Sequence, residues 1–305
     1  MKVLVTGGAG FIGSHLVDRL IKEGHEVVVI DNLSTGKRKN NNREANFYKT
    51  DILGSRLARI FQKEKPRLVC HYAAQMDVRK SVEDPLFDAK SNILGFLNLL
   101  EASIKNGTQR VIFASSGGAI YGDQTSYPAT EEDPTHPLSP YGVSKLASEQ
   151  YLYYYQKNCG LDYAVLRFSN VYGPRQNPLG EAGVVAIFAK KLLSAEQPLI
   201  NGNGMQTRDY IFVDDIVDAN MAVINSNIND TFNVGTGRET SVNELFSSLL
   251  EQTGSKAKPV HGMEKKGEQR RSCISSGKLN RLLGWEPRVS LKEGLLRTVQ
   301  YIKGE

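Results

Sequence analysis

Short apolar runs alternate with longer stretches of helical periodicity through the first half of the chain and slightly beyond. The apolar runs that predict strands are residues 3–5, 27–30, 68–70, 111–113 and 164–166. The stretches between them that predict helices are residues 13–23, 55–64, 85–106 and 141–158. Short strands that are apolar at every position are typical of a parallel sheet covered by helices on both faces. The pattern therefore predicts an α/β protein built on a doubly wound (Rossmann) parallel sheet.

The regular alternation ends near residue 172. Beyond it, helical periodicity returns at residues 184–193, 214–224, 242–253, 275–283 and 291–302, and residues 231–234 predict one more strand. We expect residues 1–172 to form the Rossmann domain, to which residues 210–237 return. Residues 173–209 and 238–305 are expected to form a smaller C-terminal α/β lobe. No long flexible linker separates the two parts, so we expect them to pack directly and to bind a ligand between them.

A glycine-rich loop follows the first predicted strand and reads Thr6-Gly7-Gly8-Ala9-Gly10-Phe11-Ile12-Gly13. Glycines at this spacing allow a tight turn, a close approach of the backbone to a pyrophosphate and close packing of the next helix. Asp31 ends the second predicted strand, where a carboxylate accepts from a ribose 2′-hydroxyl and repels a 2′-phosphate. The sequence therefore predicts a dinucleotide site that favours NAD over NADP. A plain glycine turn is the alternative, and Lys37–Lys39 leaves the phosphorylated cofactor open.

Tyr141 and Lys145 stand four residues apart, so they share one face of a predicted helix. Such a pair alone is weak, because exposed helices often carry it. Ser115 and Ser116 strengthen it, since they follow a predicted strand and so lie at the carboxyl edge of the sheet, where open α/β folds bind ligands. An ammonium and a cationic nicotinamide would both lower the pKa of the tyrosine. Together these groups predict a hydride-transfer site at a carbinol carbon.

Further strings complete a resemblance to a known family. They are Asp51-Ile52, His71-Tyr72-Ala73-Ala74-Gln75, Asn92, the segment Leu166 to Arg175 and the segment Arg208 to Asp215. With the glycine loop and Tyr141/Lys145, the chain resembles the extended short-chain dehydrogenase/reductase family along nearly its whole length. Within that family it is most similar to the nucleotide-sugar branch, in the form of the UDP-glucose (UDP-galactose) 4-epimerases.

This resemblance implies an isomerase that uses NAD and a UDP-sugar. Hydride would leave C4 for the nicotinamide and return to the other face of a 4-keto intermediate. Tyr141 would remove the O4 proton, Lys145 would assist it, and Ser116 would hydrogen-bond O4. Residues 1–172 would bind NAD, and the C-terminal lobe would bind the nucleotide sugar. The resemblance also implies a homodimer that pairs helices 85–106 and 141–158, with the run at residues 151–155 in the interface.

The resemblance assigns ligand contacts residue by residue. Expected at the cofactor are Gly7, Gly10, Phe11, Ile12, Gly13, Asp31, Asn32, Ser34, Gly36, Asp51, Ile52, Ala73, Ala74, Gln75, Asn92, Ser115, Tyr141 and Lys145. Expected at the substrate are Ser116, Tyr141, Asn170, Asn201, Arg208, Arg271 and Ser272. Asn170 and Arg208 would contact phosphates, with Arg271 as a second arginine, and Asn201 would lie against the uracil. Ser272 would occupy the position that gates the sugar 2-substituent, where a small residue suggests that UDP-GlcNAc and UDP-GalNAc also fit.

The chain departs from the epimerase pattern at the serine. The family often reads Ser-Ser-Ser-Ala-x-Val-Tyr-Gly, whereas an ungapped alignment here places Gly117 at the last serine. Ser116 is the nearest hydroxyl, and Ser115 remains an alternative. Gly117 and Gly118 also stand where 4,6-dehydratases carry an acidic pair, which favours epimerisation. A dehydratase or another hydride-transfer enzyme of the branch, and a non-catalytic dinucleotide sensor, are the alternative functions.

Composition, charge and cysteine spacing limit the classes of ligand and partner that the sequence predicts. The 305 residues are 40% hydrophobic and 23% charged, with a mean hydropathy of −0.35, as in ordinary globular proteins. The net charge of +5 is mostly scattered, which favours small anions, and we expect no nucleic-acid partner. Cys70, Cys159 and Cys273 have no metal-site spacing, so we expect neither a metal nor a disulfide framework. No apolar run approaches the roughly 18 residues of a membrane span, and no signal-peptide pattern opens the sequence. We therefore expect a cytoplasmic protein without a membrane partner.

Overall fold

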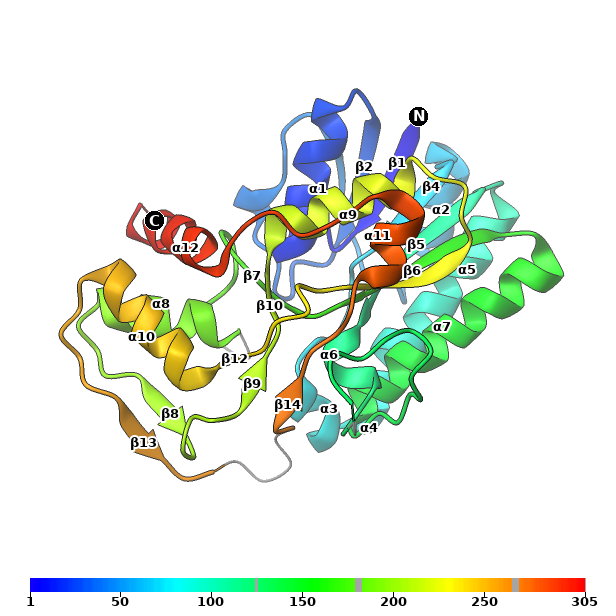
Figure 1. The fold of residues 1–305 in the computed structure, drawn as a ribbon. Coiled ribbons are helices and arrows are strands. Elements are labelled where there is room, and N and C mark those ends of the chain that lie inside the picture. Colours follow the sequence, from blue (N-terminus) through cyan, green and yellow to red (C-terminus); the bar gives the residue numbers. More distant parts are fainter. Residues whose placement is uncertain (124–125, 179–182, 265–268, 305) are drawn as a thin grey trace.

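A seven-stranded parallel sheet forms the centre of the computed structural model, which describes residues 1–123, 126–178, 183–264 and 269–304. Its strand order is β11-β6-β5-β4-β1-β2-β3 (Figure 1). The strands are β1 (Lys2–Thr6), β2 (Glu26–Asp31), β3 (Asn46–Lys49), β4 (Leu68–His71), β5 (Arg110–Ser116), β6 (Asp162–Phe168) and β11 (Asp230–Val234). Every neighbouring pair is parallel. The predicted doubly wound parallel sheet is confirmed.

Helices cover both faces of this sheet. On one face lie α1 (Phe11–Lys22) and α9 (Val213–Ile224), and on the other lie α2 (Arg56–Glu64), α5 (Gly95–Lys105) and α7 (Pro140–Cys159) (Figure 1). Alternate strand residues pack on opposite sides: Val3 and Val5 of β1 join Leu16 of α1, whereas Leu4 joins Phe61 of α2. All are buried, and each such side chain contributes about 1.5–3 kcal/mol relative to exposure. This explains why the strands read as continuous apolar runs.

The segment after the fourth strand differs from its prediction. One helix was expected over residues 85–106, but the structure has α4 (Pro85–Ala89), a π-helical turn η2 (Lys90–Leu94) and α5. Two capping aspartates start the helices before it: Asp77 caps α3 (Val78–Glu83), and Asp84 caps α4, which has Pro85 in its first turn. A π turn inserts an extra residue without breaking the apolar pattern, so periodicity did not reveal it.

The C-terminal part has small sheets instead of one large one. The strand pairs are β7 (Asn170–Tyr172) with β10 (Tyr210–Phe212) and β8 (Leu199–Asn201) with β13 (Val260–Gly262), and the three-stranded sheet joins β12 (Thr240–Ser241), β9 (Thr207–Arg208) and β14 (Arg271–Ser272). Its helices are α8 (Val184–Leu193), α10 (Val242–Thr253), α11 (Gly277–Leu283) and α12 (Leu291–Lys303). Phe188 of α8, Phe246 of α10 and Leu295 of α12 share one core.

The predicted helices 184–193 and 242–253 are confirmed with these bounds, and predicted strand 231–234 is β11, which lies in the central sheet beside β6. The strands of two or three residues had no sequence signal, because a run that short has no period to detect. Edge strand β3 was also missed, since its residues are only half buried or exposed. Two short elements complete the fold: η1 (Arg38–Asn40) and α6 (Gly117–Ile120).

Candidate active site

The glycine loop forms a cradle at the carboxyl end of β1. Gly7 has a φ of +69°, and a Cβ placed there would lie 2.7 Å from the backbone nitrogen of Ala73. A Cβ at Gly13 would lie 2.3 Å from the carbonyl oxygen of Gly7. Gly10 precedes α1, whose first backbone N–H groups have no side-chain cap. A backbone without side chains, next to a helix N-terminus, can approach a pyrophosphate closely. The residues present therefore fit a dinucleotide cofactor.

Asp31 is fixed at the end of β2 by the loops around it. Its Oδ2 accepts from the Ala9 N–H at 3.0 Å, and its Oδ1 accepts from the Leu33 N–H at 2.7 Å. A Cβ at Gly36 would lie 3.0 Å from both carboxylate oxygens. Each oxygen has two lone pairs, so the carboxylate can still accept from a ribose hydroxyl. Close by, Asp51 accepts from the Asn32 side-chain amide at 2.8 Å.

The loop after β4 is held by one asparagine. The Oδ1 of Asn92 accepts from the Gln75 N–H at 2.8 Å, and its Nδ2 donates to the Gln75 carbonyl at 2.9 Å. Asn92 lies in the π turn η2 and is buried. These two bonds fix the backbone of the loop that includes Ala73 and Ala74, which also lies against the glycine cradle at Ala73.

Tyr141 and Lys145 lie on α7, which Ser139 caps through the Gly142 N–H. The Tyr141 hydroxyl lies near Ser116, the last residue of β5, close enough for the serine to lower the pKa of the tyrosine. The Lys145 Nζ donates to the Ala114 carbonyl at 2.8 Å and lies 5.7 Å from the centre of the Tyr141 ring. The structure thus brings all three predicted catalytic residues to the carboxyl edge of the sheet.

Electrostatics at this site depart from the sequence-based expectation. Burial raises the pKa of Tyr141 to about 12, although the nearby Ser116 side chain acts to lower it. Burial also lowers the pKa of Lys145 to about 8, against the opposing effect of Asp88 and Glu149. We expected Lys145 to lower the pKa of Tyr141, but burial raises this pKa, and among the protein's own groups the one that opposes burial is Ser116.

Ser115 points away from Tyr141. It is buried, and its hydroxyl donates to Oε1 of Glu149 at 2.5 Å. Glu149 forms a buried ion pair with Arg167 at 2.7 Å, and Arg167 also donates to the Tyr121 hydroxyl at 2.8 Å. Because the Ser115 hydroxyl already donates its proton to Glu149, it is not available to donate to a substrate oxygen. This favours Ser116 over Ser115 as the hydroxyl that acts with Tyr141. Glu149 and Arg167 were not predicted, although Glu149 stands one helical turn after Lys145.

The predicted substrate residues Asn170 and Ser272 face α6. A Cβ built at Gly118 would lie 3.7 Å from both the Asn170 Oδ1 and the Ser272 Oγ. A side chain at Gly118 would therefore meet both polar groups at ordinary van der Waals distance. Gly117 is packed more tightly, because a Cβ built there would lie 2.6 Å from the Cδ1 of Ile274. The absence of a side chain at Gly118, two residues after Ser116, leaves space next to Asn170 and Ser272.

The two predicted arginines differ in their surroundings. Arg208 lies in β9 directly beside Ser272 of β14, and its Nη1 donates to the Thr207 carbonyl at 2.8 Å. Arg271 is half exposed, pairs with Glu239 through Nε at 2.9 Å, and lies 4.2 Å above the Tyr127 ring. It would have to exchange Glu239 for a phosphate. Asn201 ends β8, and its carbonyl accepts from Gln206 at 3.1 Å.

Known proteins place this chain in a family. The NAD dependent epimerase/dehydratase family matches residues 3–235. The chain belongs to this family. It is 43% identical over 311 residues to the UDP-glucose 4-epimerase of Mycolicibacterium smegmatis, covering 100% of this chain and 99% of that protein. The resemblance drawn from the motifs is thereby confirmed.

Two crystal structures of family members match the whole fold. The UDP-glucose 4-epimerase of Thermotoga maritima, solved with UDP-glucose, is 51% identical with a TM-score of 0.98, covering 100% of this chain and 99% of that one. The Thermus thermophilus UDP-glucose 4-epimerase, solved with NAD, is 42% identical with a TM-score of 0.95 and the same coverage. NAD is the cofactor of this epimerase family.

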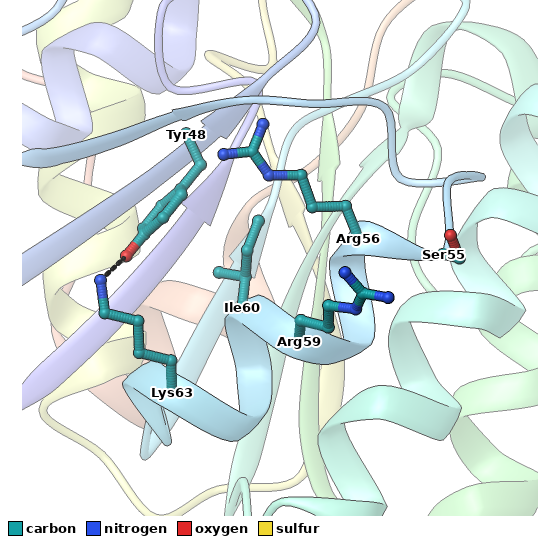
Figure 2. Close-up of a pocket in the computed structure, with 6 residues that line it drawn as sticks. All are labelled: Tyr48, Ser55, Arg56, Arg59, Ile60 and Lys63. Atoms are coloured by element: carbon teal, nitrogen blue, oxygen red, sulfur yellow. Dashed lines mark hydrogen bonds between the residues drawn. The ribbon is translucent and has the colours of Figure 1, made fainter.

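A second hollow lies outside the family's glycine cradle. It lies along α2 and has a volume of about 320 Å³. Figure 2 shows the residues that line it, which are Tyr48, Ser55, Arg56, Arg59, Ile60 and Lys63. Lys63 donates to the Tyr48 hydroxyl at 2.9 Å. The hollow's three cationic side chains, Arg56, Arg59 and Lys63, are exposed, as on an ordinary solvated helix face. The hollow contains none of the predicted site residues.

Two findings concern other ligands. Within residues 1–123, 126–178, 183–264 and 269–304, no group of three or more His, Cys, Asp and Glu side chains is arranged to hold a metal ion. In the same ranges, no helix combines the length and apolarity needed to cross a membrane.

Proposed function

We propose that this protein is an NAD-dependent UDP-sugar 4-epimerase that interconverts UDP-galactose and UDP-glucose. The observation that carries the proposal is that Ser116, Tyr141 and Lys145 meet at the carboxyl end of β5, in the same parallel sheet whose strand β1 ends in a glycine cradle fit for a dinucleotide. Residues 1–172 with 210–237 would bind NAD, because β11 belongs to the central sheet. Residues 173–209 and 238–305 would bind the UDP-sugar; of these, 179–182, 265–268 and 305 lie outside the described residues.

In this proposal the chain's own residues handle the proton and orient the sugar. Tyr141 accepts the O4 proton while Ser116 hydrogen-bonds O4 and holds C4 in place. Lys145, with its amine fixed on the Ala114 carbonyl, keeps positive charge near the phenol. NAD, which the glycine cradle and Asp31 would hold, would supply the reversible hydride chemistry at C4, and its positive ring would favour the Tyr141 phenolate. Tyr141 then returns the proton to O4 of the epimer.

Gly117 and Gly118 favour epimerisation over dehydration. Elimination of water from the sugar needs an additional acid and base near C5 and C6, and neither glycine has a side chain to supply one. Epimerisation needs one reversible hydride transfer, which NAD would supply, and one proton acceptor, the role that we give to Tyr141 with the help of Ser116 and Lys145.

The sugar nucleotide would lie across the small sheets of the C-terminal part. We assign Asn170 and Arg208 to the phosphates, Arg271 to the pyrophosphate as a second cation and Asn201 to the uracil. Arginine suits this role because its guanidinium forms parallel charge-assisted bonds with phosphate oxygens. Ser272 beside Gly118 leaves room at the sugar, so UDP-GlcNAc and UDP-GalNAc are included as substrates of the proposal.

A homodimer and a cytoplasmic location belong to the same proposal. Leu86 of α4, Leu94 of η2 and Val143 and Tyr154 of α7 are at least half exposed, an apolar surface of the kind that interfaces cover. The paired helices expected from the family resemblance include these residues. All three cysteines are free, as in proteins of reducing compartments such as the cytoplasm.

Proton NMR of the purified protein tests the function. UDP-galactose, UDP-glucose and UDP-GlcNAc are incubated separately without added cofactor, and the anomeric signals are followed to equilibrium. Appearance of the C4 epimer supports both epimerisation and retained NAD. A 4-keto-6-deoxy product would indicate a dehydratase, and unchanged sugars after NAD is supplied would favour the non-catalytic sensor.

A further inference from the structure

Asp88 is a fully buried carboxylate that the mechanism above does not use. It lies on α4 and accepts three side-chain hydrogen bonds. Its Oδ1 accepts from the Gln75 Nε2 and the Asn92 Nδ2, both at 3.0 Å. Its Oδ2 accepts from the Ser144 hydroxyl at 2.6 Å. Burying a carboxylate is costly unless it is fully hydrogen-bonded, and these three donors offset that cost.

The three donors come from the two sides of the candidate active site. Gln75 and Asn92 belong to the loop and π turn expected at the cofactor, and Asn92 already fixes the Gln75 backbone through two further bonds. Ser144 lies on α7 directly before Lys145 and three residues after Tyr141. Asp88 thus links the cofactor loop to the catalytic helix through short hydrogen bonds, beside a longer contact of 3.5 Å from the Ser148 hydroxyl to the Asn92 carbonyl.

A different buried aspartate shows what a purely structural role looks like. Asp215 on α9 is also buried, but it accepts from the backbone N–H groups of Arg288 and Val289. Those bonds hold one chain segment in place and involve no predicted site residue. Asp88, in contrast, accepts from three side chains, two of which belong to residues expected at the cofactor and one to the catalytic helix.

We propose that Asp88 is a positioning residue that sets the cofactor loop at Gln75 and Asn92 against the Tyr141–Lys145 pair through Ser144. The inference rests on the proposed epimerase function. Misplacement of reacting groups by about 1 Å can cost about 100-fold in rate, so a link of this kind controls turnover without touching substrate.

The charge of Asp88 gives the proposal a specific signature. Asp88 raises the pKa of both Tyr141 and Lys145. For Tyr141 it adds to the larger effect of burial, and for Lys145 it opposes the larger effect of burial. The other titratable groups facing Lys145 are Glu149, which raises its pKa, and His71, whose own pKa is lowered by burial and by Lys145. Removing the Asp88 charge therefore lowers the pKa values of both the tyrosine and the lysine.

The test compares Asp88→Asn with Ser144→Ala and their double variant. We expect Asp88→Asn to reduce kcat for UDP-galactose by about tenfold or more with little change in KM, and to move the kcat pH profile toward lower pH. Ser144→Ala should reduce kcat as well. The kcat of Ser144→Cys, which retains a weaker donor, should lie between those of the wild type and Ser144→Ala. The fold-loss of kcat in the double variant should be smaller than the product of the two single fold-losses. NAD affinity of the cofactor-stripped protein, measured by calorimetry, should fall in Asp88→Asn.

Asp215→Asn is the matched control: we expect a lower Tm with unchanged kcat, pH profile and NAD affinity. The proposal is overturned if Asp88→Asn behaves like Asp215→Asn, or if its pH profile stays in place. If Asp88→Asn does not fold, the Ser144 series decides by the same criteria. Failure of wild-type epimerisation would reject the proposed function, whereas the NAD titration would still decide the role of Asp88.

Discussion

The two halves of the candidate site are built by different means. In the cofactor half, the glycine cradle, Asp31 and Ser116 all stand at the ends of strands of five to seven residues in one parallel sheet. In the substrate half, Arg208 and Ser272 stand in strands of two residues. Regular backbone pairing therefore positions the first half, and the second needs another support.

That support is Asp209. Its backbone N–H donates to the Ser272 carbonyl at 2.9 Å, and its carbonyl accepts from the Asn170 N–H at 2.9 Å. Its buried carboxylate accepts from the backbone and hydroxyl of Thr236 and from the Gly237 N–H. One residue thus joins three segments that are far apart in sequence. Strand ends thus place the glycine loop, Asp31 and Ser116, whereas the polar contacts of Asp209 join the segments of Asn170 and Ser272.

Tyr141→Phe gives the largest expected effect. The substitution removes the proton acceptor from the cofactor half but keeps the ring, so kcat should fall by about 100-fold or more. Fold, NAD content and UDP binding should persist, as measured by circular dichroism, cofactor release and calorimetry with UDP. Tyr153→Phe, on the exposed side of α7, is the matched control and should retain full activity. Survival of turnover in Tyr141→Phe would show that the proposed base is wrong.

Gly13→Ala tests how the cofactor half depends on its backbone. The new methyl would lie 2.3 Å from the Gly7 carbonyl oxygen, so α1 or the loop must shift. We expect about 1–3 kcal/mol of destabilisation and loss of bound NAD during gel filtration, with UDP affinity preserved. Gly277→Ala, at the start of α11, meets its nearest atom at 3.4 Å and should change neither. NAD retention in Gly13→Ala would contradict the cradle.

The sequence predicted the cofactor half because its elements are long enough to show a period. The apolar runs at residues 3–5 and 27–30 became β1 and β2, and the glycines between them identified the loop. Tyr141 and Lys145 shared a helix face as their spacing required. The sequence did not predict the buried carboxylates of Asp88 and Glu149. A single buried acid produces no periodic pattern, and in the sequence it cannot be distinguished from a surface acid until its hydrogen-bond donors are known.

The substrate half was predictable only through family motifs. Asn170 and Ser272 were named from the resemblance, and no local pattern predicted that Asp209 joins them. Hydrogen bonds between residues separated by tens of positions leave no trace in spacing. The role of Asp209, which stands between β9 and β10, became visible only when the fold paired β10 with β7 and β9 with β14.

Asp209→Asn tests the support of the substrate half. An amide in place of the carboxylate turns N–H donors toward the N–H groups of Thr236 and Gly237, which should cost about 1–3 kcal/mol. Because burial raises the pKa of Asp209, the folded state holds a proton more tightly than the unfolded chain does. Wild-type stability from this group thus falls as pH rises from the unfolded toward the folded pKa, and the variant lacks that dependence. We expect a higher KM for the UDP-sugar with unchanged NAD affinity.

Chemical denaturation across pH, together with steady-state kinetics, checks this prediction. Asp215→Asn serves again as the control, since it loses backbone hydrogen bonds of the same kind without a link to Asn170 or Ser272. An equal rise in KM in both variants would mean that the effect is general loosening. Loss of NAD from Asp209→Asn would break the proposed separation of the two halves.

Ser272→Tyr has the smallest expected effect and the most selective. Ser272 is buried, and its hydroxyl lies 3.7 Å from the Cβ position of Gly118, so a phenol ring must occupy space between β14 and α6. We expect kcat/KM for UDP-GlcNAc to fall about tenfold or more relative to UDP-galactose, because the larger 2-substituent needs that space. Ser272→Ala adds no bulk and should keep the wild-type ratio, measured by the same anomeric NMR assay. If both sugars lose activity equally, Ser272 supports the half-site but does not select the substrate.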